Sequence, residues 1–187
     1  MCFIEAQSWA YNHNEDPREA YVKLNGIVAW HYNVSSDAGY PVGVNVFIVH
    51  RTNCTLQERR RFNTQDRDEA EMLRDYLRGL RHGTVLVGVA YAEPMRTMRP
   101  PHPNAALSEL SKLGADVSDV KNRGAFVFAT RIGDPASTVL KKLLDQISVN
   151  DTTTRQPRIF ATFSGAQYTI YHSRALISTL SSLHCVP

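Results

Sequence analysis

Residues 83–130 decide the fold: they begin with Gly83-Thr84-Val85-Leu86-Val87-Gly88-Val89-Ala90-Tyr91 and end with Gly124-Ala125-Phe126-Val127-Phe128-Ala129-Thr130. Both ends of this stretch are nearly continuous apolar runs, which is typical of strands buried on both faces. Between them, apolar residues recur at helical spacing, at Ala106, Leu107, Leu110 and Leu113. Gly114 follows, where a helix commonly needs a left-handed cap residue. The stretch therefore predicts a strand, a short helix and a second strand at the centre of the domain.

The segments on either side predict further strands and helices around this unit. Asn25-Gly26 lies between two strand-like runs and is a strong signal for a tight hairpin. Residues 66–81 predict the clearest helix, because acidic residues come first, arginines come last and leucines form one stripe. The other expected elements are strands at 3–8, 20–24, 27–32 and 42–50, an edge strand at 58–63, a helix at 135–147, a hairpin of 158–163 with 167–172, and a helix at 173–183.

Length and composition indicate a globular protein with one domain, or one domain and an extension. The chain has 187 residues, of which 43% are hydrophobic and 21% charged, so a core can form without staples. The net charge is only +3, and Lys and Arg are dispersed apart from Arg59-Arg60-Arg61. We therefore expect no nucleic-acid partner, which would need a denser basic face. No apolar run approaches the roughly 18 residues that cross a bilayer, so we expect no membrane insertion.

Cysteines and glycosylation triplets bear on the compartment in which the protein works. The N-terminus lacks a signal-peptide pattern, which fits either a cytosolic protein or a mature chain whose leader has been removed. Three triplets match the N-glycosylation acceptor pattern, at Asn33, Asn53 and Asn150, and favour the second option. A bridge between Cys2 and Cys185 would tie down both termini and leave Cys54 as a free or intermolecular thiol. Three unrelated, reduced cysteines are the alternative.

The chain carries no strong catalytic motif, so we expect neither an enzyme nor a bound cofactor. It has no nucleophile elbow and no phosphate-binding loop. Its seven histidines share no metal-ligand spacing, so we expect no metal site. Asp66 and Asp68 stand at a helix start, where carboxylates are favourable in any case. We interpret the run Arg59-Arg60-Arg61 as a solvated edge rather than a receptor for an anionic group.

Several segments, in their order and spacing, resemble the interleukin-like EMT-inducer domain of the FAM3 superfamily. The matching phrases are Glu19–Gly26, Gly43–Val49, Arg61-Phe62-Asn63-Thr64, Gly83–Val89, Leu110–Gly114 and Ala125-Phe126-Val127. The resemblance covers roughly residues 3–133. It implies an extracellular α/β (α+β) fold with a β-sandwich-like core of mixed sheets, flanking helices and usually disulfides. We therefore expect this domain at residues 1–133, with a C-terminal hairpin-helix extension at residues 134–187 packed on it.

The resemblance also implies a place for a ligand. The superfamily includes secreted cytokine-like proteins, and the stem domain of protein O-mannose β-1,2-N-acetylglucosaminyltransferase, which binds sugar without catalysis. That stem holds its sugar with an Arg near an aromatic-Asp-Thr turn, an acidic loop after the buried strand, and an Arg-Asp pair before the closing strand. Carried over position by position, these groups fall near Arg60, at Ala92-Glu93 and at Lys121-Asn122.

The carried-over site departs from the family pattern. Ala92 replaces an acid, although Glu93 follows it, and Lys121 keeps a positive charge without the planar fork of arginine. Asn122 keeps an acceptor and adds donors. Tyr91 could supply an apolar wall together with Met95 and Met98, although loop packing is the stronger interpretation of the two methionines.

We therefore expect a secreted, non-catalytic, lectin-like protein that binds glycans, such as an N-acetylhexosamine or another simple sugar. A homo-oligomer would suit this function, because avidity compensates for weak single sites. The alternative is a secreted cytokine-like ligand that acts through a protein surface. That alternative would expose a sizeable apolar patch and no small-molecule cleft.

Overall fold

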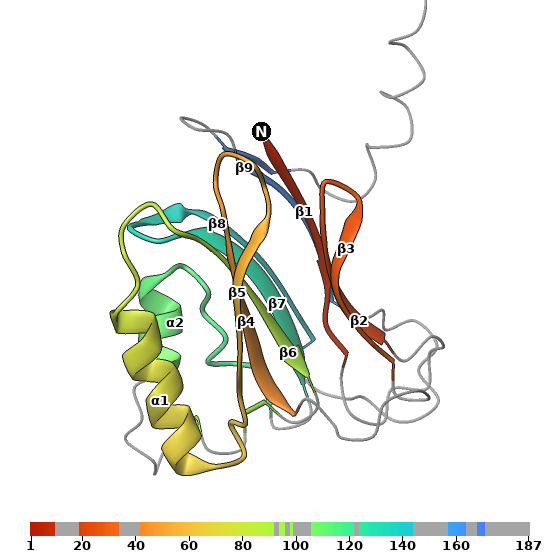
Figure 1. Ribbon diagram of the computed structural model, residues 1–187. Helices are drawn as coiled ribbons and strands as arrows, with labels where there is room; N and C mark the ends of the chain where they lie inside the picture. The colour runs from red at the N-terminus through yellow and green to blue at the C-terminus, as the bar shows by residue number, and fades with distance from the viewer. Residues whose placement is uncertain are drawn as a thin grey trace, which may run out of the picture.

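The computed structural model describes residues 1–9, 19–33, 42–91, 94–95, 98, 106–121, 124–143, 157–163 and 168–170. Within these ranges it contains two five-stranded sheets and two helices (Figure 1). Sheet A has the strand order β10 (Tyr168–Ile170), β9 (Arg158–Phe163), β1 (Cys2–Gln7), β2 (Glu19–Leu24), β3 (Ile27–Asn33). Sheet B has the order β5 (Leu56–Phe62), β4 (Gly43–Val49), β6 (Val85–Tyr91), β7 (Ala125–Arg131), β8 (Asp134–Leu143). The helices are α1 (Arg67–Arg78) and α2 (Ala106–Lys112).

Sheet B is the middle layer of the molecule. Figure 1 shows sheet A on one side of it and both helices on the other. Successive residues of a strand point to opposite faces, so Phe47 packs between the sheets while Val46 packs under the helices. Every residue of β4 and β6 is buried. The prediction that the Val85–Val89 run is a strand buried on both faces is confirmed.

Glycine is required in the central strand because an aromatic ring lies over it. Gly88 of β6 opposes Phe128 of β7, and a Cβ added at Gly88 would overlap the Phe128 ring. Phe128 itself is fully buried in the layer beneath the helices. The Phe128 ring therefore fills the space that a side chain at position 88 would need.

The local signals in the sequence are confirmed. Asn25 and Gly26 have φ values of 50° and 80° and join β2 to β3, as a type I′ hairpin requires. The Asp66 side chain caps α1 by accepting hydrogen bonds from the Asp68 and Glu69 amides. Gly114, with a φ of 83°, follows α2. Strand β5 lies at the edge of sheet B, as expected.

The predicted helix at 135–147 is wrong, because β8 covers most of that range. It pairs with β7, with Leu140 opposite Phe128 and Leu143 opposite Ala125. Val139 packs against the core between the sheets and Leu140 against the core under the helices. Adjacent apolar residues that serve two faces of one strand mimic helical spacing, which explains the error.

The fold class is confirmed: an α+β sandwich with flanking helices. Every strand pair that the structure describes is antiparallel, whereas we expected mixed sheets. Strand β8 extends sheet B, and the predicted hairpin of β9 and β10 extends sheet A, so the described parts of 134–170 complete both layers. The helix predicted at 173–183 lies outside the described residues.

The predicted Cys2–Cys185 bridge is wrong. Cys2 of β1 bonds to Cys54 in the turn between β4 and β5, with a Cα–Cα distance of 5.0 Å. Both residues are buried in the core between the sheets. The bond therefore joins sheet A to sheet B, and it also excludes a free thiol at Cys54. Cys185 lies outside the described residues.

Candidate functional site

One end of sheet B gathers the segments that the sequence analysis assigned to sugar binding. Strand β6 ends at Tyr91, and its antiparallel neighbour β7 begins at Ala125. The chain therefore leaves β6 and enters β7 at the same end of the sheet. Exposed Lys121 lies just before β7, and its carbonyl accepts a hydrogen bond of 2.9 Å from the Gly124 amide. Glu93 and Asn122 lie outside the described residues.

Tyr91 is a core residue rather than an exposed wall. Its exposed fraction is 0%, and its ring packs against those of Trp9 and Tyr32, with centroids 5.1 and 4.9 Å away. Trp9 also forms a parallel bridge with Tyr91, which ties the segment after β1 to the end of β6. The structure therefore corrects the expectation that Tyr91 faces a ligand. Its ring instead packs in the core between the two sheets.

Arg60 is engaged on the helix side of β5. Its guanidinium lies 4.9 Å from the centroid of the Tyr76 ring of α1 and pairs with Glu58. Burial, followed by the nearby Glu58 charge, raises the pKa of Tyr76 to about 12. The structure thus brings Lys121 to the β6 end of sheet B but holds Arg60 against α1, a contact that sequence spacing did not reveal.

Pro94, Met95 and Met98, the described residues between β6 and α2, are buried. Met95 and Met98 are 0% and 1% exposed and belong to the core under the helices, so their packing role is confirmed. The Thr64 hydroxyl donates a buried hydrogen bond of 2.6 Å to the Pro94 carbonyl. A Cβ at Gly43 would collide with the Phe62 carbonyl, so the start of β4 lies close to the chain that leaves β5 towards Thr64. These contacts hold Pro94, Met95 and Met98 against the core under the helices.

About half of the chain, including this end of sheet B, matches the model of a known domain family. Residues 42–134 match the family model of the interleukin-like EMT inducer. The chain carries an interleukin-like EMT inducer domain. The matched stretch contains the four strands β4 to β7, both helices and the first residue of β8. A search of curated proteins finds no match to this chain.

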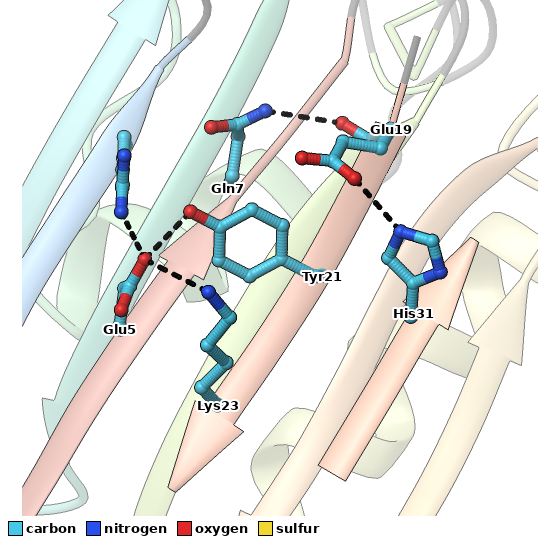
Figure 2. Close-up of polar contacts among 7 residues, drawn as sticks. Glu5, Gln7, Glu19, Tyr21, Lys23 and His31 are labelled. Atoms are coloured by element: carbon cyan, nitrogen blue, oxygen red, sulfur yellow. Dashed lines mark hydrogen bonds and ion pairs between the residues drawn. The ribbon is translucent and has the colours of Figure 1, made fainter. Parts of the chain in front are cut away.

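Outside the interleukin-like EMT inducer match, sheet A carries a charged cluster on its outer face (Figure 2). Glu5 Oε1 accepts a hydrogen bond of 2.7 Å from the Tyr21 hydroxyl. The same oxygen pairs with Arg158 of β9, and Lys23 Nζ lies 3.6 Å away. Strand β1, in the middle, is thus tied through one carboxylate to both of its neighbours.

Electrostatics favour the charged form of Glu5 and the neutral form of Tyr21. Burial would raise the pKa of Glu5, but the hydrogen bonds from Tyr21 and Arg158 outweigh burial and lower it. Burial and the Glu5 carboxylate both raise the pKa of Tyr21. A general acid or base needs a pKa near the working pH. The cluster therefore serves the structure of sheet A rather than proton transfer.

A second polar group lies beside the first on the same face. Glu19 Oε2 and His31 Nε2 are 2.8 Å apart, and Gln7 Nε2 donates to the Glu19 carbonyl at 3.3 Å (Figure 2).

Within the described ranges, no group of three His, Cys, Asp or Glu residues is placed to hold a metal ion. No helix in the described part of the chain is long and apolar enough to cross a membrane.

Two features of the structure were not predicted from the sequence. The pairing of Glu5 with Arg158 joins residues 153 positions apart, so no local pattern could reveal it. The second feature is a basic cleft at the end of the interleukin-like EMT inducer domain opposite to Lys121, lined by His50, Arg51, Arg81 and His82. The sequence contained one signal for the cleft: His50-Arg51 follows β4, and Arg81-His82 comes shortly before β6. These two strands are antiparallel neighbours in the fold.

Proposed function

We propose that this protein is a secreted, non-catalytic carbohydrate-binding protein whose sugar site lies where β6 ends and β7 begins. One observation carries the proposal. The two strands are antiparallel neighbours, so the segments that contain Glu93 and Lys121-Asn122 start from the same end of sheet B. Had the strands been parallel, the two segments would have left opposite ends of the sheet.

The chemistry of these residue types suits a sugar. An ammonium group, an amide and a carboxylate supply both donors and acceptors for hydroxyl groups. Small-ligand sites depend on a few polar groups held in fixed positions. The Thr64–Pro94 hydrogen bond and the buried Met95 side chain hold Pro94 and Met95 in place next to β6. Lys121 is exposed, so a ligand can reach it at this edge without disturbing the core.

Two further observations support secretion. The buried Cys2–Cys54 disulfide fits an oxidising compartment such as the secretory pathway. The family match adds an extracellular precedent by analogy. We propose that the protein forms a homo-oligomer, because several weak sugar sites acting together bind far more tightly than one.

Binding to a glycan array tests the proposal. Oxidised protein should bind a small set of glycans, and those sugars should raise its melting temperature, because they bind the native state only. Lys121→Ala should reduce both signals. Lys112→Ala is the matched control, since it also removes an exposed lysine, and the adjacent Leu113 carbonyl contacts Thr130 near the other end of β7. A blank array with well-folded protein would overturn the proposal.

One observation favours the cytokine-like alternative. Ile27 and Val28, at the tip of the β2–β3 hairpin, are 74% and 55% exposed. Exposed apolar residues that lie together suit a protein partner better than a sugar. Under this alternative, Ile27→Asp with Val28→Asp would abolish binding to cells, and free sugars would not compete. Under the carbohydrate proposal, the same variant binds glycans as the wild type does.

A further inference from the structure

A cleft of about 340 Å³ opens at the end of sheet B that is remote from Lys121. Val49 of β4 and Val85 of β6 pair with each other, are buried, and form its floor. Its walls come from the two residues after β4, from Gln57 of β5 and from residues 81–84 before β6. The cleft is thus built by three adjacent strands and does not depend on a single loop.

The walls of this cleft are basic. His50 and Arg51 follow β4, while Arg81 and His82 come shortly before β6. No carboxylate is among the residues that line the cleft. Neither Arg51 nor Arg81 has an ion-pair partner among the residues that the structure describes. Two guanidinium groups therefore line a concave surface with no counter-ion from the described residues.

The imidazole groups are held in place by their neighbours. The Asn53 amide donates to His50 Nδ1 at 3.4 Å, and the Thr52 hydroxyl lies 2.9 Å from the same nitrogen. Because that nitrogen accepts, the neutral His50 ring carries its proton on Nε2 and can donate from there. The His82 ring lies so close to Gly133 that a Cβ added there would collide with it. Each ring therefore has a close neighbour beside the cleft.

The guanidinium of Arg51 extends across the cleft to the β6 side. Its Nη1 atom lies 3.8 Å from the place where a Cβ of Gly83 would be. Gly83 has a φ of 82° and follows His82, so the turn before β6 leaves open space for this side chain. Residues from two separate turns thus converge on one spot, which is what a binding site for a single group requires.

We propose that this cleft binds an oxyanion, a carboxylate or sulfate group, carried on an acidic sugar. Arginine forks match the paired oxygens of such groups, and charge-assisted hydrogen bonds are stronger than neutral ones. Gln57 and Thr84, which also line the cleft, offer polar groups to neighbouring hydroxyls. Assigning the anion to a sugar rests on the proposed function, whereas the preference for an oxyanion rests on the cleft alone.

An NMR titration of oxidised, ¹⁵N-labelled protein tests this inference. The probes are glucuronic acid, N-acetylglucosamine 6-sulfate, their neutral parents glucose and N-acetylglucosamine, inorganic sulfate, and a short poly-glutamate peptide. One or both acidic sugars should shift the Gly83 and Thr84 amides at concentrations where the neutral parents do not. Which acidic sugar does so distinguishes a carboxylate site from a sulfate site.

Charge-matched variants separate this site from general attraction to a basic surface. Arg51→Gln with Arg81→Gln should weaken binding of the acidic sugar by about tenfold or more, as expected for lost charged hydrogen bonds. Arg67→Gln with Lys141→Gln removes the same net charge from exposed positions elsewhere and should leave affinity unchanged. Arg51→Lys with Arg81→Lys keeps the charge without the fork and should give an intermediate affinity.

Each other outcome overturns the inference. Equal losses in both charge-neutralised variants would indicate non-specific attraction. Binding of inorganic sulfate or of the peptide, with no response to either acidic sugar, would remove the sugar from the assignment. Binding of a neutral sugar that depends on Lys121 but not on Arg51 would leave the proposed function in place and reject the cleft, so the two failures are distinguishable.

Discussion

Cys2 and Cys54 form a disulfide that joins the first strand of sheet A to the β4–β5 turn of sheet B. The two residues are 52 positions apart in the sequence. Such a link restricts the unfolded chain and, at this loop length, stabilises the fold by roughly 4 kcal/mol in the chain-entropy treatment. It also fixes the sheets against each other next to the basic cleft, since Cys54 lies four residues after His50.

Replacing Cys2 and Cys54 with serine should therefore lower the free energy of unfolding by roughly 4 kcal/mol, measured by urea denaturation. Cys185→Ser is the control, because it leaves the Cys2–Cys54 bond intact. A peptide map without reductant should contain the Cys2–Cys54 pair. A Cys2–Cys185 pair, or unchanged stability in the double serine variant, would contradict this assignment.

The Glu5 cluster should make stability depend on pH in the acidic range. The folded-state pKa of Glu5 is lowered. The contribution of Glu5 to the free energy of unfolding is therefore fully present above its unfolded-state pKa, and it is lost as the pH falls through its folded-state pKa. Glu5→Gln should lower the free energy of unfolding at pH 7 by about 2 kcal/mol, the value of a hydrogen bond to a charged group. Below pH 5, the unfolding free energy of Glu5→Gln should also change less steeply with pH than that of the wild type. The difference in slope should correspond to the loss of about one titrating group.

Glu71→Gln is the matched control for that change. Glu71 pairs with Arg67 one turn away on the solvent side of α1, so its removal should cost only about 0.5 kcal/mol or less. Equal losses for Glu5→Gln and Glu71→Gln would show that the Glu5 cluster contributes no more than a surface pair.

Gly88→Ala should destabilise the protein by about 1–3 kcal/mol, because the added methyl group would overlap the Phe128 ring in the middle of sheet B. Gly79→Ala, at the end of α1, is the control: its φ is −78° and the nearest atoms are 3.6 Å from the new methyl group. It should be neutral or slightly stabilising. Thermal unfolding compares the two, and a neutral Gly88→Ala would contradict the close packing of β6 on β7.

The sequence predicted those features that depend on neighbouring residues. The β6 run and the Asn25-Gly26 turn were predicted correctly, because burial of a strand and positive φ values leave local patterns. The helix predicted over β8 failed, because Val139 and Leu140 serve two cores that only the packed sheets define. In that case tertiary contacts outweighed local spacing.

The position of Lys121 was predictable from the sequence, but the surroundings of Tyr91 and Arg60 were not. The order of β6, α2 and β7 was enough to bring Lys121 to the end of β6, once the two strands pair antiparallel. The burial of Tyr91 depends on Trp9 and Tyr32, which come from distant segments. The engagement of Arg60 depends on Tyr76 of α1. Such contacts between remote segments leave no signal in sequence spacing.

Hydrogen–deuterium exchange with the best sugar from the glycan array tests the central claim most directly. A bound sugar should slow exchange in the peptides that contain Tyr91 and Lys121, at the two strand ends that meet on sheet B, and should leave β1 to β3 unchanged. Protection confined to sheet A, or no protection of either peptide at a saturating sugar concentration, would contradict the account.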